Sequence, residues 1–261
     1  MKKITFANSK GGVGKTTLTV GVARTLAELG KRVLLLDIDP QGNLSSVFLN
    51  KDFLTKDFLS YWFNSEITEN QLKTTIEKSN YKNIDIVPCY TKLMTQTIKS
   101  LTNDVASDFV LKNNIKKIEK HLNTNYDYVF FDINPTTTII TTNVFLSVDE
   151  IIVTVSPHKF SFNGIERFFS DYNWYLDKWK KIGLTMNNNM NAIVLNNVRK
   201  NKTHAVLVEK LENSNLRNII LKTKIPSSIT LEKHTMLSSP TITDKSPFWL
   251  LTKELIQKNI F

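Results

Sequence analysis

The sequence predicts an α/β fold in which a mostly parallel, twisted sheet is flanked by helices. Short runs of continuous apolar character, such as residues 32–39 and 126–132, are typical of strands buried on both faces of a parallel sheet. Other segments carry apolar residues at steps of three and four, as amphipathic helices do. Because the two kinds of segment alternate without a repeat or a low-complexity linker, residues 1–261 are expected to form a single domain.

The expected strands cover residues 4–7, 32–39, 84–87, 126–132, 151–155, 192–196 and 218–224. The first expected helix has an apolar stripe that begins at Leu18, and it ends at Gly30. Further helices are expected over residues 53–78, 105–123, 161–180, 203–213 and 247–261. The segment 53–78 is expected to lie on the surface, with an aromatic cluster at Phe58, Tyr61, Trp62 and Phe63. The aromatic stripe of 161–180 is interpreted as a packing face.

The stretch of residues 8–17, between the first strand and the first helix, has the pattern of a phosphate-binding loop. Glycines let backbone N–H groups converge on phosphate oxygens, and the helix N-terminus adds partial positive charge at the same place. Lys15 can reach the β- and γ-phosphates, and the Thr16 hydroxyl can bind Mg²⁺. Ser9 stands where the ordinary motif begins with glycine, and a second lysine, Lys10, follows it. The expected nucleotide contacts of this loop are Gly11, Gly12, Val13, Gly14, Lys15, Thr16 and Thr17.

Three aspartates follow the apolar strands and are candidates for chemistry at the phosphates. Asp132 ends the strand 126–132 and is expected to bind Mg²⁺ through water. Asp39 is the candidate that orients or deprotonates the attacking water. Asp37 leaves the same strand face if the strand is regular, and it is expected to support the metal's ligands without touching the metal.

Other polar residues follow strands as well. The loop of residues 8–17, the aspartates, Asn196 and Pro226 all lie where a predicted strand ends. In parallel sheets, ligands bind at the carboxyl ends of the strands. These features are therefore expected to meet at one edge of the sheet.

Composition and charge restrict the remaining possibilities. The net charge is +10, and it is uneven: residues 1–158 carry 18 Lys and Arg against 16 Asp and Glu, whereas residues 159–261 carry 16 against 8. This asymmetry indicates either a polyanion partner for the C-terminal part or a solvated lysine surface. The single cysteine, Cys89, excludes an intramolecular disulfide and is expected to be a small buried side chain. No signal peptide and no long apolar run is present, so a cytoplasmic protein is expected.

The loop KGGVGKTT, the segment KRVLLLDIDPQGN and the segment YDYVFFDINP together resemble the ParA-type (Soj-like) partition ATPases of the deviant Walker-A P-loop family. The later segments IVLNN and IPSSITLEKHTMLSSPTI are similar to that family too, so the resemblance covers essentially the whole chain. It implies ATP and Mg²⁺ as cofactors and hydrolysis of ATP to ADP and phosphate. It also implies that Asn196, Asn197 and Pro226 lie where the family contacts adenine.

The resemblance implies partners as well. ATP would drive a sandwich homodimer in which Lys10 of each subunit reaches the other's nucleotide. The dimer would bind double-stranded DNA without sequence preference, so that the protein associates with the nucleoid. A ParB-like centromere-binding protein would stimulate hydrolysis. The N-terminal helix-turn-helix extension of larger relatives is not expected here.

The segment after Pro226 departs from the family, because Ser227 and Thr230 stand where the family often carries basic residues. The candidate DNA contacts are therefore Arg199, Lys200 and Lys202, followed by Lys222, Lys224 and Lys233.

A MinD-like, membrane-associated positioning ATPase is the alternative. Proteins of that kind end in a basic amphipathic helix, and this chain ends in PFWLLTKELIQKNIF, with apolar residues on one wide face. That segment has only Lys253 and Lys258 as basic residues, whereas membrane-surface helices usually carry more. It is therefore interpreted as a helix that packs against the core, and no membrane partner is expected.

Overall fold

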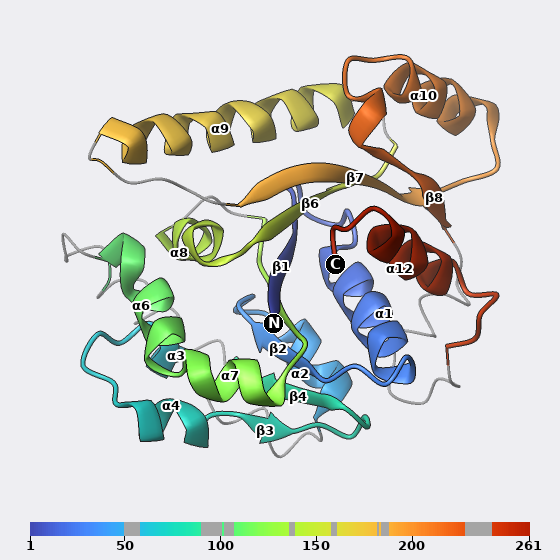
Figure 1. Ribbon diagram of the computed structural model, residues 1–261. Coiled ribbons are helices and arrows are strands. Elements are labelled where there is room, and N and C mark those ends of the chain that lie inside the picture. The colour runs from blue at the N-terminus through green and yellow to red at the C-terminus, as the bar shows by residue number, and fades with distance from the viewer. Residues whose placement is uncertain are drawn as a thin grey trace.

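The computed structural model describes residues 1–49, 58–89, 101, 107–135, 139–157, 161–181, 183, 188–227 and 242–261. Within these ranges the chain forms an eight-stranded sheet with the order β3-β4-β2-β5-β1-β6-β7-β8 (Figure 1). All neighbouring strands are parallel except β3 and β4, which pair antiparallel at one edge. The predicted α/β fold with a mostly parallel sheet is confirmed.

The strands are β1 Lys2–Ala7, β2 Val33–Asp37, β3 Glu77–Lys78, β4 Ile84–Val87, β5 Tyr128–Asp132, β6 Glu150–Val155, β7 Asn189–Val198 and β8 Ile220–Pro226. Every residue of β2 and β6 is buried, which explains why these strands read as continuous apolar runs. Strand β1 lies between β5 and β6. The loop that follows β1 therefore emerges between the carboxyl ends of two neighbouring strands.

The helices are α1 Lys15–Glu28, α2 Asn43–Phe48, α3 Leu59–Trp62, α4 Glu69–Thr74, α6 Val110–Lys117, α7 Glu119–Asn125, α8 Ile139–Ser147, α9 Ser161–Lys181, α10 Lys202–Glu212 and α12 Pro247–Gln257, with short 3₁₀ turns η2 Ser107–Phe109 and η3 Arg217–Ile219. One core contains buried residues of α1, α2 and α12, and the other contains buried residues of α3 and α6 to α10. The helices thus cover both faces of the sheet, with α1 and α12 side by side (Figure 1).

The expectation of one surface helix over residues 53–78 is wrong within the part that the structure describes. From residue 58 onward the chain forms two short helices, α3 and α4, and then the edge strand β3. Thr68 restarts the helix through a capping box with Gln71. Trp62 is fully buried, and its indole N–H donates to the Thr75 hydroxyl at 2.8 Å. The aromatic residues interrupt the helix because two of them, Trp62 and Phe63, are buried in the core.

Of two further expectations, one needs a correction and the other is confirmed. The helix expected over residues 105–123 is two helices, because Ile118 leaves helical geometry between α6 and α7. The stripe of α9 is confirmed as a packing face, since Ile165, Tyr172 and Trp179 are buried. Phe168 is also buried, although it was not part of the expected stripe.

The C-terminal helix packs against the core, as expected. Phe248, Leu251 and Leu255 of α12 have no exposed surface, and α12 lies against α1 and β8. The helix ends at Gln257 instead of continuing to the last residue. The Phe261 ring then packs 5.9 Å from the Phe130 ring, edge to face. No helix among the described residues is both long enough and apolar enough to cross a membrane.

Candidate functional site

The loop between β1 and α1 is held by hydrogen bonds to neighbouring strands. Asn8 is buried; its side-chain amide donates to the Thr154 carbonyl at 2.7 Å, and its oxygen accepts from the Lys10 amide at 2.9 Å. Gly12 and Gly14 have φ angles of 71° and 91°, the left-handed region that glycine adopts without strain. Gly14 also begins α1, so the loop leads directly into a helix N-terminus.

Asn196, from the distant strand β7, closes one side of this loop. Its side-chain amide donates to the Val13 carbonyl at 2.7 Å. A Cβ atom added to Gly14 would overlap this amide, so only glycine fits at that position. Asn196 is 1% exposed, and its side-chain oxygen makes no hydrogen bond within the described ranges. This buried oxygen is available to a donor group on a ligand.

The loop faces a cavity of about 430 Å³ at the carboxyl edge of the sheet. The sequence-predicted residues that line it are Gly11, Gly12, Gly14, Lys15, Thr16, Thr17, Asp39, Asn196, Asn197 and Pro226. The structure therefore brings together residues from β1, β2, β7 and β8 that are far apart in the chain. The volume lies in the range of small-molecule sites.

Four lining residues were not among the expected site residues: Asn43, Ile133, Pro135 and Ile225. Asn43 and Pro135 belong to the segments DPQGN and DINP, which were used only to recognise the family. Their position next to the aspartates was the available signal. Ile133 and Ile225 are apolar residues next to strand ends, and nothing in the sequence separates them from core residues.

Two of the aspartates are neighbours across the sheet. Asp37 ends β2 and Asp132 ends β5, and the two are register partners with no exposed surface. Burial raises the pKa of Asp132 well above its usual value, and Asp37 adds to this effect, whereas the Thr16 hydroxyl and Lys15 oppose it. Neither carboxylate oxygen of Asp132 makes a hydrogen bond of normal distance and angle within the described residues.

Asp37 and Asp39 are not on one regular strand, contrary to the expectation. Strand β2 ends at Asp37, and the Asp39 amide donates back to the Asp37 carboxylate at 3.3 Å. Asp39 is therefore turned into the cavity and half-buried, whereas Asp37 is enclosed. The other Asp37 oxygen accepts from the Ser45 hydroxyl at 2.6 Å and from the Ser45 amide at 2.7 Å. Burial raises the pKa of Asp37 to about 7, and the two bonds from Ser45 oppose this rise.

Lys15 is the cation of this group. Its side chain lies in the cavity wall and the residue is 7% exposed. Burial lowers its pKa, and the nearby carboxylates of Asp132 and Asp39 oppose that effect. A buried ammonium in the wall of this cavity is suited to bind phosphate oxygens.

The same edge fits a magnesium ion. Mg²⁺ usually takes one or two protein oxygens, phosphate oxygens and water. Both carboxylate oxygens of Asp132 are buried and lack a hydrogen bond of normal geometry among the described residues, and Thr16 lines the adjacent cavity. No group of three or more His, Cys, Asp and Glu side chains suited to a metal occurs among the described residues.

Lys10 and the basic candidates lie outside this cavity. Lys10 is exposed at the start of the loop. Arg199 and Lys200 lie in the turn between β7 and α10, Lys202 is the first residue of α10, and all three are exposed. The Arg199 amide donates to the ring of His204 at 3.2 Å, which holds the turn against α10.

The second group of basic candidates is weaker. Lys222 is exposed, but the ammonium of Lys224 pairs with Glu212 at 2.7 Å. This ion pair reduces the charge that Lys224 can offer to a polyanion. Lys233 lies outside the described residues.

The chain matches a known family over most of its length. A family model described as an AAA domain matches residues 1–181. A ParA family protein of Mycoplasma pneumoniae is 30% identical, over 97% of this chain and 96% of the relative. The chain belongs to the ParA family. Among other ParA-like relatives, the sporulation initiation inhibitor Soj of Bacillus subtilis is 28% identical over 65% of this chain and 64% of its own.

Other similar proteins differ in what their names say they do. The cell division protein PomZ of Myxococcus xanthus is 32% identical, over 63% of this chain and 49% of its own. A plasmid partition protein of Borrelia burgdorferi, solved with AMPPNP, has a TM-score of 0.71 at 24% identity and covers 99% of this chain and 98% of its own. Cobyrinic acid a,c-diamide synthase of Mycobacterium smegmatis, with an ATP analogue and magnesium, has a TM-score of 0.76 at 19% identity, covering 100% and 94%. At these identities the two structures show the fold alone.

Proposed function

We propose that this chain is a Mg²⁺-dependent ATPase that segregates DNA. The proposal rests on one observation: the glycine loop, Lys15, Asp39 and Asn196 line the same cavity. Membership of the ParA family supports the same function. The proposal covers ATP hydrolysis, the ATP-bound dimer and binding of double-stranded DNA without sequence preference.

The phosphates of ATP would lie against the glycine loop. Backbone N–H groups of the loop and the N-terminus of α1 would donate to the phosphate oxygens, and Lys15 would neutralise the β- and γ-phosphates. Bound magnesium would supply a second positive charge between these phosphates. Thr16 would contact the ion, and Asp132 would hold it through water, because Asp132 is fully buried next to Thr16 and does not line the cavity.

Asp39 is the residue that we assign to the attacking water. It is the one aspartate of the described strand ends β2 and β5 that lines the cavity. One of its oxygens accepts from the Gln41 amide at 3.0 Å, which fixes the carboxylate and leaves the second oxygen for water. Asp37 would stay behind it as a support, because Ser45 already occupies one of its oxygens.

The base of the nucleotide would lie on the side of the cavity that β7 and β8 form. Asn196, Asn197 and Pro226 line that part. The unpaired side-chain oxygen of Asn196 can accept from an amino group. We assign adenine to this position.

Lys10 would act across a dimer. It is exposed and lies next to the cavity without lining it, so its ammonium is free to reach the nucleotide of a second copy. A head-to-tail pair would then bring two copies of the basic turn at Arg199 onto one assembly. A ParB-like partner would stimulate hydrolysis and release the DNA, and the protein would associate with the nucleoid.

One experiment tests the whole proposal. The purified chain is incubated with a random-sequence DNA duplex in the presence of ATP and Mg²⁺, of ADP and Mg²⁺, or of ATP with EDTA, and phosphate release and DNA binding are measured in parallel. Phosphate release and DNA binding that both require ATP and Mg²⁺ are expected. The same conditions with anionic vesicles serve as the comparison. ATP-dependent vesicle binding without DNA binding would replace the partition function with a MinD-like one.

A further inference from the structure

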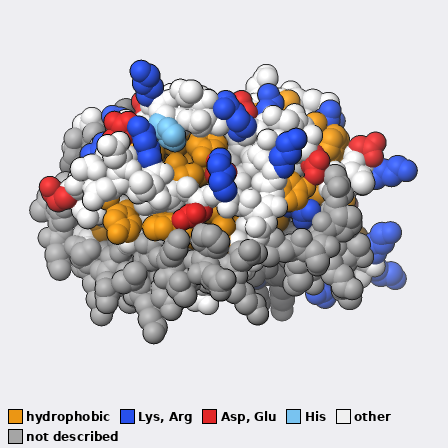
Figure 2. Space-filling model, turned by 90° about the horizontal axis from the view of Figure 1, so that it is seen from below, with side chains coloured by type: hydrophobic (Ala, Val, Ile, Leu, Met, Phe, Trp, Pro, Cys, Tyr) orange, Lys and Arg blue, Asp and Glu red, His pale blue; other side chains and the backbone are white. Residues whose placement is uncertain are grey.

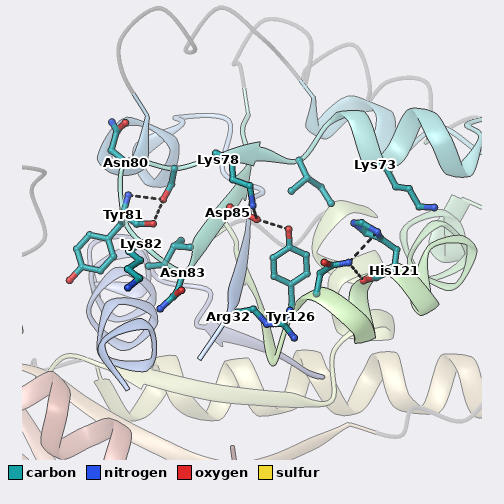
Figure 3. Close-up of a pocket in the computed structure, with 14 residues that line it drawn as sticks. Arg32, Lys73, Lys78, Asn80, Tyr81, Lys82, Asn83, Asp85, His121 and Tyr126 are labelled. Atoms are coloured by element: carbon teal, nitrogen blue, oxygen red, sulfur yellow. Dashed lines mark hydrogen bonds and ion pairs between the residues drawn. The ribbon is translucent and has the colours of Figure 1, made fainter. Parts of the chain in front are cut away.

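A second cavity, of about 590 Å³, lies at the amino edge of the sheet. Arg32, Asn83 and Tyr126 line it, and these residues come just before β2, β4 and β5 (Figure 3). The glycine loop follows β1 at the opposite, carboxyl edge. The two cavities share no lining residue.

The lining of this cavity carries an excess of positive charge. Four cationic residues, Arg32, Lys73, Lys78 and Lys82, face one carboxylate, Asp85. Figure 3 shows Asp85 between Lys78 and Tyr126. The Lys78 ammonium and the Tyr126 hydroxyl both bind one Asp85 oxygen at 2.8 Å. The single carboxylate is therefore already compensated.

The other cations are not all compensated. Lys73 pairs with Glu69, one helical turn earlier in the chain. Arg32 and Lys82 form no ion pair with any carboxylate in the described part of the chain. His121, on the Lys73 side of the cavity, adds no fixed charge, because burial and then Lys73 lower its pKa. Two exposed cations thus remain without an anion at one concave surface.

Both cations are carried by ordered backbone. The Arg32 amide donates to the Asp127 carboxylate at 2.8 Å, and its guanidinium donates to the Thr124 carbonyl at 2.8 Å. This leaves most of the guanidinium N–H groups for a ligand. Lys82 lies in the turn before β4, where Asn83 has a φ of 65° and donates to the Ala27 carbonyl at 3.2 Å. Pre-ordered donors lose less entropy when they bind a ligand.

We propose that this cavity, which we call the basic groove, binds a small phosphorylated anion. A guanidinium and an ammonium on one concave surface are the groups that proteins use for phosphate. The volume suits a phosphate ester of nucleotide size. The inference is independent of the proposed ATPase function, because it uses none of the residues of the first cavity.

The surrounding surface favours a compact anion over a long duplex. Among the described residues of the lower face, Lys and Arg side chains stand apart with Asp and Glu among them (Figure 2). A DNA track needs a continuous basic stripe. A single phosphate group needs only the two or three donors that the groove provides.

Inorganic pyrophosphate is the probe that tests this proposal. Calorimetric titration at low ionic strength uses the full chain saturated with ADP, and the same titration uses Lys15→Ala protein, so that the glycine loop does not contribute. One site is expected in both. Lys82→Gln and Arg32→Gln should each weaken binding roughly tenfold or more, because each removes a charged hydrogen-bond donor. Lys82 has an exposed side chain, so its variant should keep the melting temperature of the parent.

Two exposed lysines outside the groove, Lys31 and Lys120, provide matched controls. Lys31→Gln and Lys120→Gln remove the same charge and should leave the affinity unchanged. Absence of a site, or equal losses in all four variants, would overturn the proposal. A parallel titration with a short DNA duplex tests whether the groove binds the phosphates of DNA instead of a small anion. Loss of duplex binding in Lys82→Gln with unchanged pyrophosphate binding would also overturn the proposal.

Discussion

The side-chain amide of Asn196 lies 2.7 Å from the carbonyl oxygen of Val13 and donates to it, although the two residues are 183 positions apart. This bond ties β7 to the glycine loop. It places one polar side chain against the backbone that is expected to hold phosphate. The space at Gly14 is limited by the same amide.

Gly14→Ala should therefore disrupt nucleotide binding. The new Cβ would overlap the Asn196 amide, and the φ of 91° is unfavourable for alanine. ATP affinity, measured by calorimetry, should fall at least roughly tenfold, which corresponds to about 1.4 kcal/mol. The overlap exists only when both side chains are present, so the double variant Gly14→Ala/Asn196→Ala should lose less affinity than the two single variants lose in sum.

Gly30→Ala is the control for backbone strain alone. Gly30 has a φ of 78°, but an added Cβ would meet nothing within 4 Å. This variant should lose about 1 kcal/mol of unfolding free energy and keep its ATP affinity. If Gly14→Ala binds ATP as Gly30→Ala does, contact with Asn196 does not limit the loop.

A second glycine tests the packing of the last helix. A Cβ on Gly21 in α1 would overlap the buried ring of Phe248 in α12. In urea titrations, Gly21→Ala should lower the free energy of unfolding by about 1–3 kcal/mol because of this overlap. The overlap should outweigh the roughly 1 kcal/mol of stability that alanine normally gains over glycine within a helix. Gly164→Ala in α9 meets nothing within 4 Å and should be neutral or stabilising. Equal stability of the two variants would show that α12 is not closely packed on α1.

Much of this arrangement could be predicted from the sequence, for a physical reason. Strands buried on both faces of a parallel sheet are continuous apolar runs, so β2, β5 and β6 were recognisable without any contact information. Because parallel strands end at one edge, the polar residues that follow them had to meet there. That rule placed Asp39 beside the glycine loop.

The errors arose where tertiary contacts override the local pattern. Residues around Trp62 have the spacing of a helix, but burial of the indole against Thr75 ends that helix. Ser45 was missed as the partner of Asp37, because a hydroxyl eight residues away carries no local signal. The turn between Asp37 and Asp39 could not be predicted from the sequence either. It forms because the Asp37 carboxylate accepts a hydrogen bond from the Asp39 amide, and such a local bond competes with strand geometry.

Asp39→Ala should abolish most turnover and keep ATP binding. The carboxylate lines the cavity and accepts from the Gln41 amide, whereas Lys15 and the loop amides would hold the phosphates. The rate of phosphate release should fall roughly 10²–10⁴-fold, the usual contribution of a general base. Asp177→Ala removes an exposed carboxylate of α9 and should leave the rate unchanged. An unchanged rate in Asp39→Ala would assign the attacking water to another residue.

The two lysines of the loop should fail in different ways. Lys15 is buried in the cavity wall, so Lys15→Ala should weaken nucleotide binding itself. Lys10 is exposed, so Lys10→Ala should bind nucleotide normally and remain monomeric. Sedimentation with a slowly hydrolysed ATP analogue distinguishes these results, with Lys31→Ala as an exposed control. A normal ATP-dependent dimer of Lys10→Ala would remove the role of Lys10 across the interface.

DNA binding should depend on the turn between β7 and α10. Arg199 and Lys200 are exposed there and Lys202 is exposed at the start of α10, whereas Lys224 is partly neutralised by Glu212. Charge reversal of Arg199 and Lys200 together should lower the affinity for all duplex sequences alike. It should also make the dependence on salt less steep, because the log–log slope is about −0.9 for each phosphate contacted. ATP-driven dimerisation should be unchanged, since these residues lie outside the nucleotide cavity.

Charge reversal of Lys180 and Lys181 is the matched control for this experiment. Both are exposed at the end of α9, so the change in net charge is the same and its position differs. If both double variants lose the same affinity and the same salt slope, the chain's overall charge attracts DNA and the turn has no special role. A loss confined to the Arg199 and Lys200 variant, measured by fluorescence anisotropy from low to moderate salt, would locate the phosphate contacts at the carboxyl end of β7. They would then lie on the same sheet edge as the nucleotide, because Asn196 of that strand already lines its cavity.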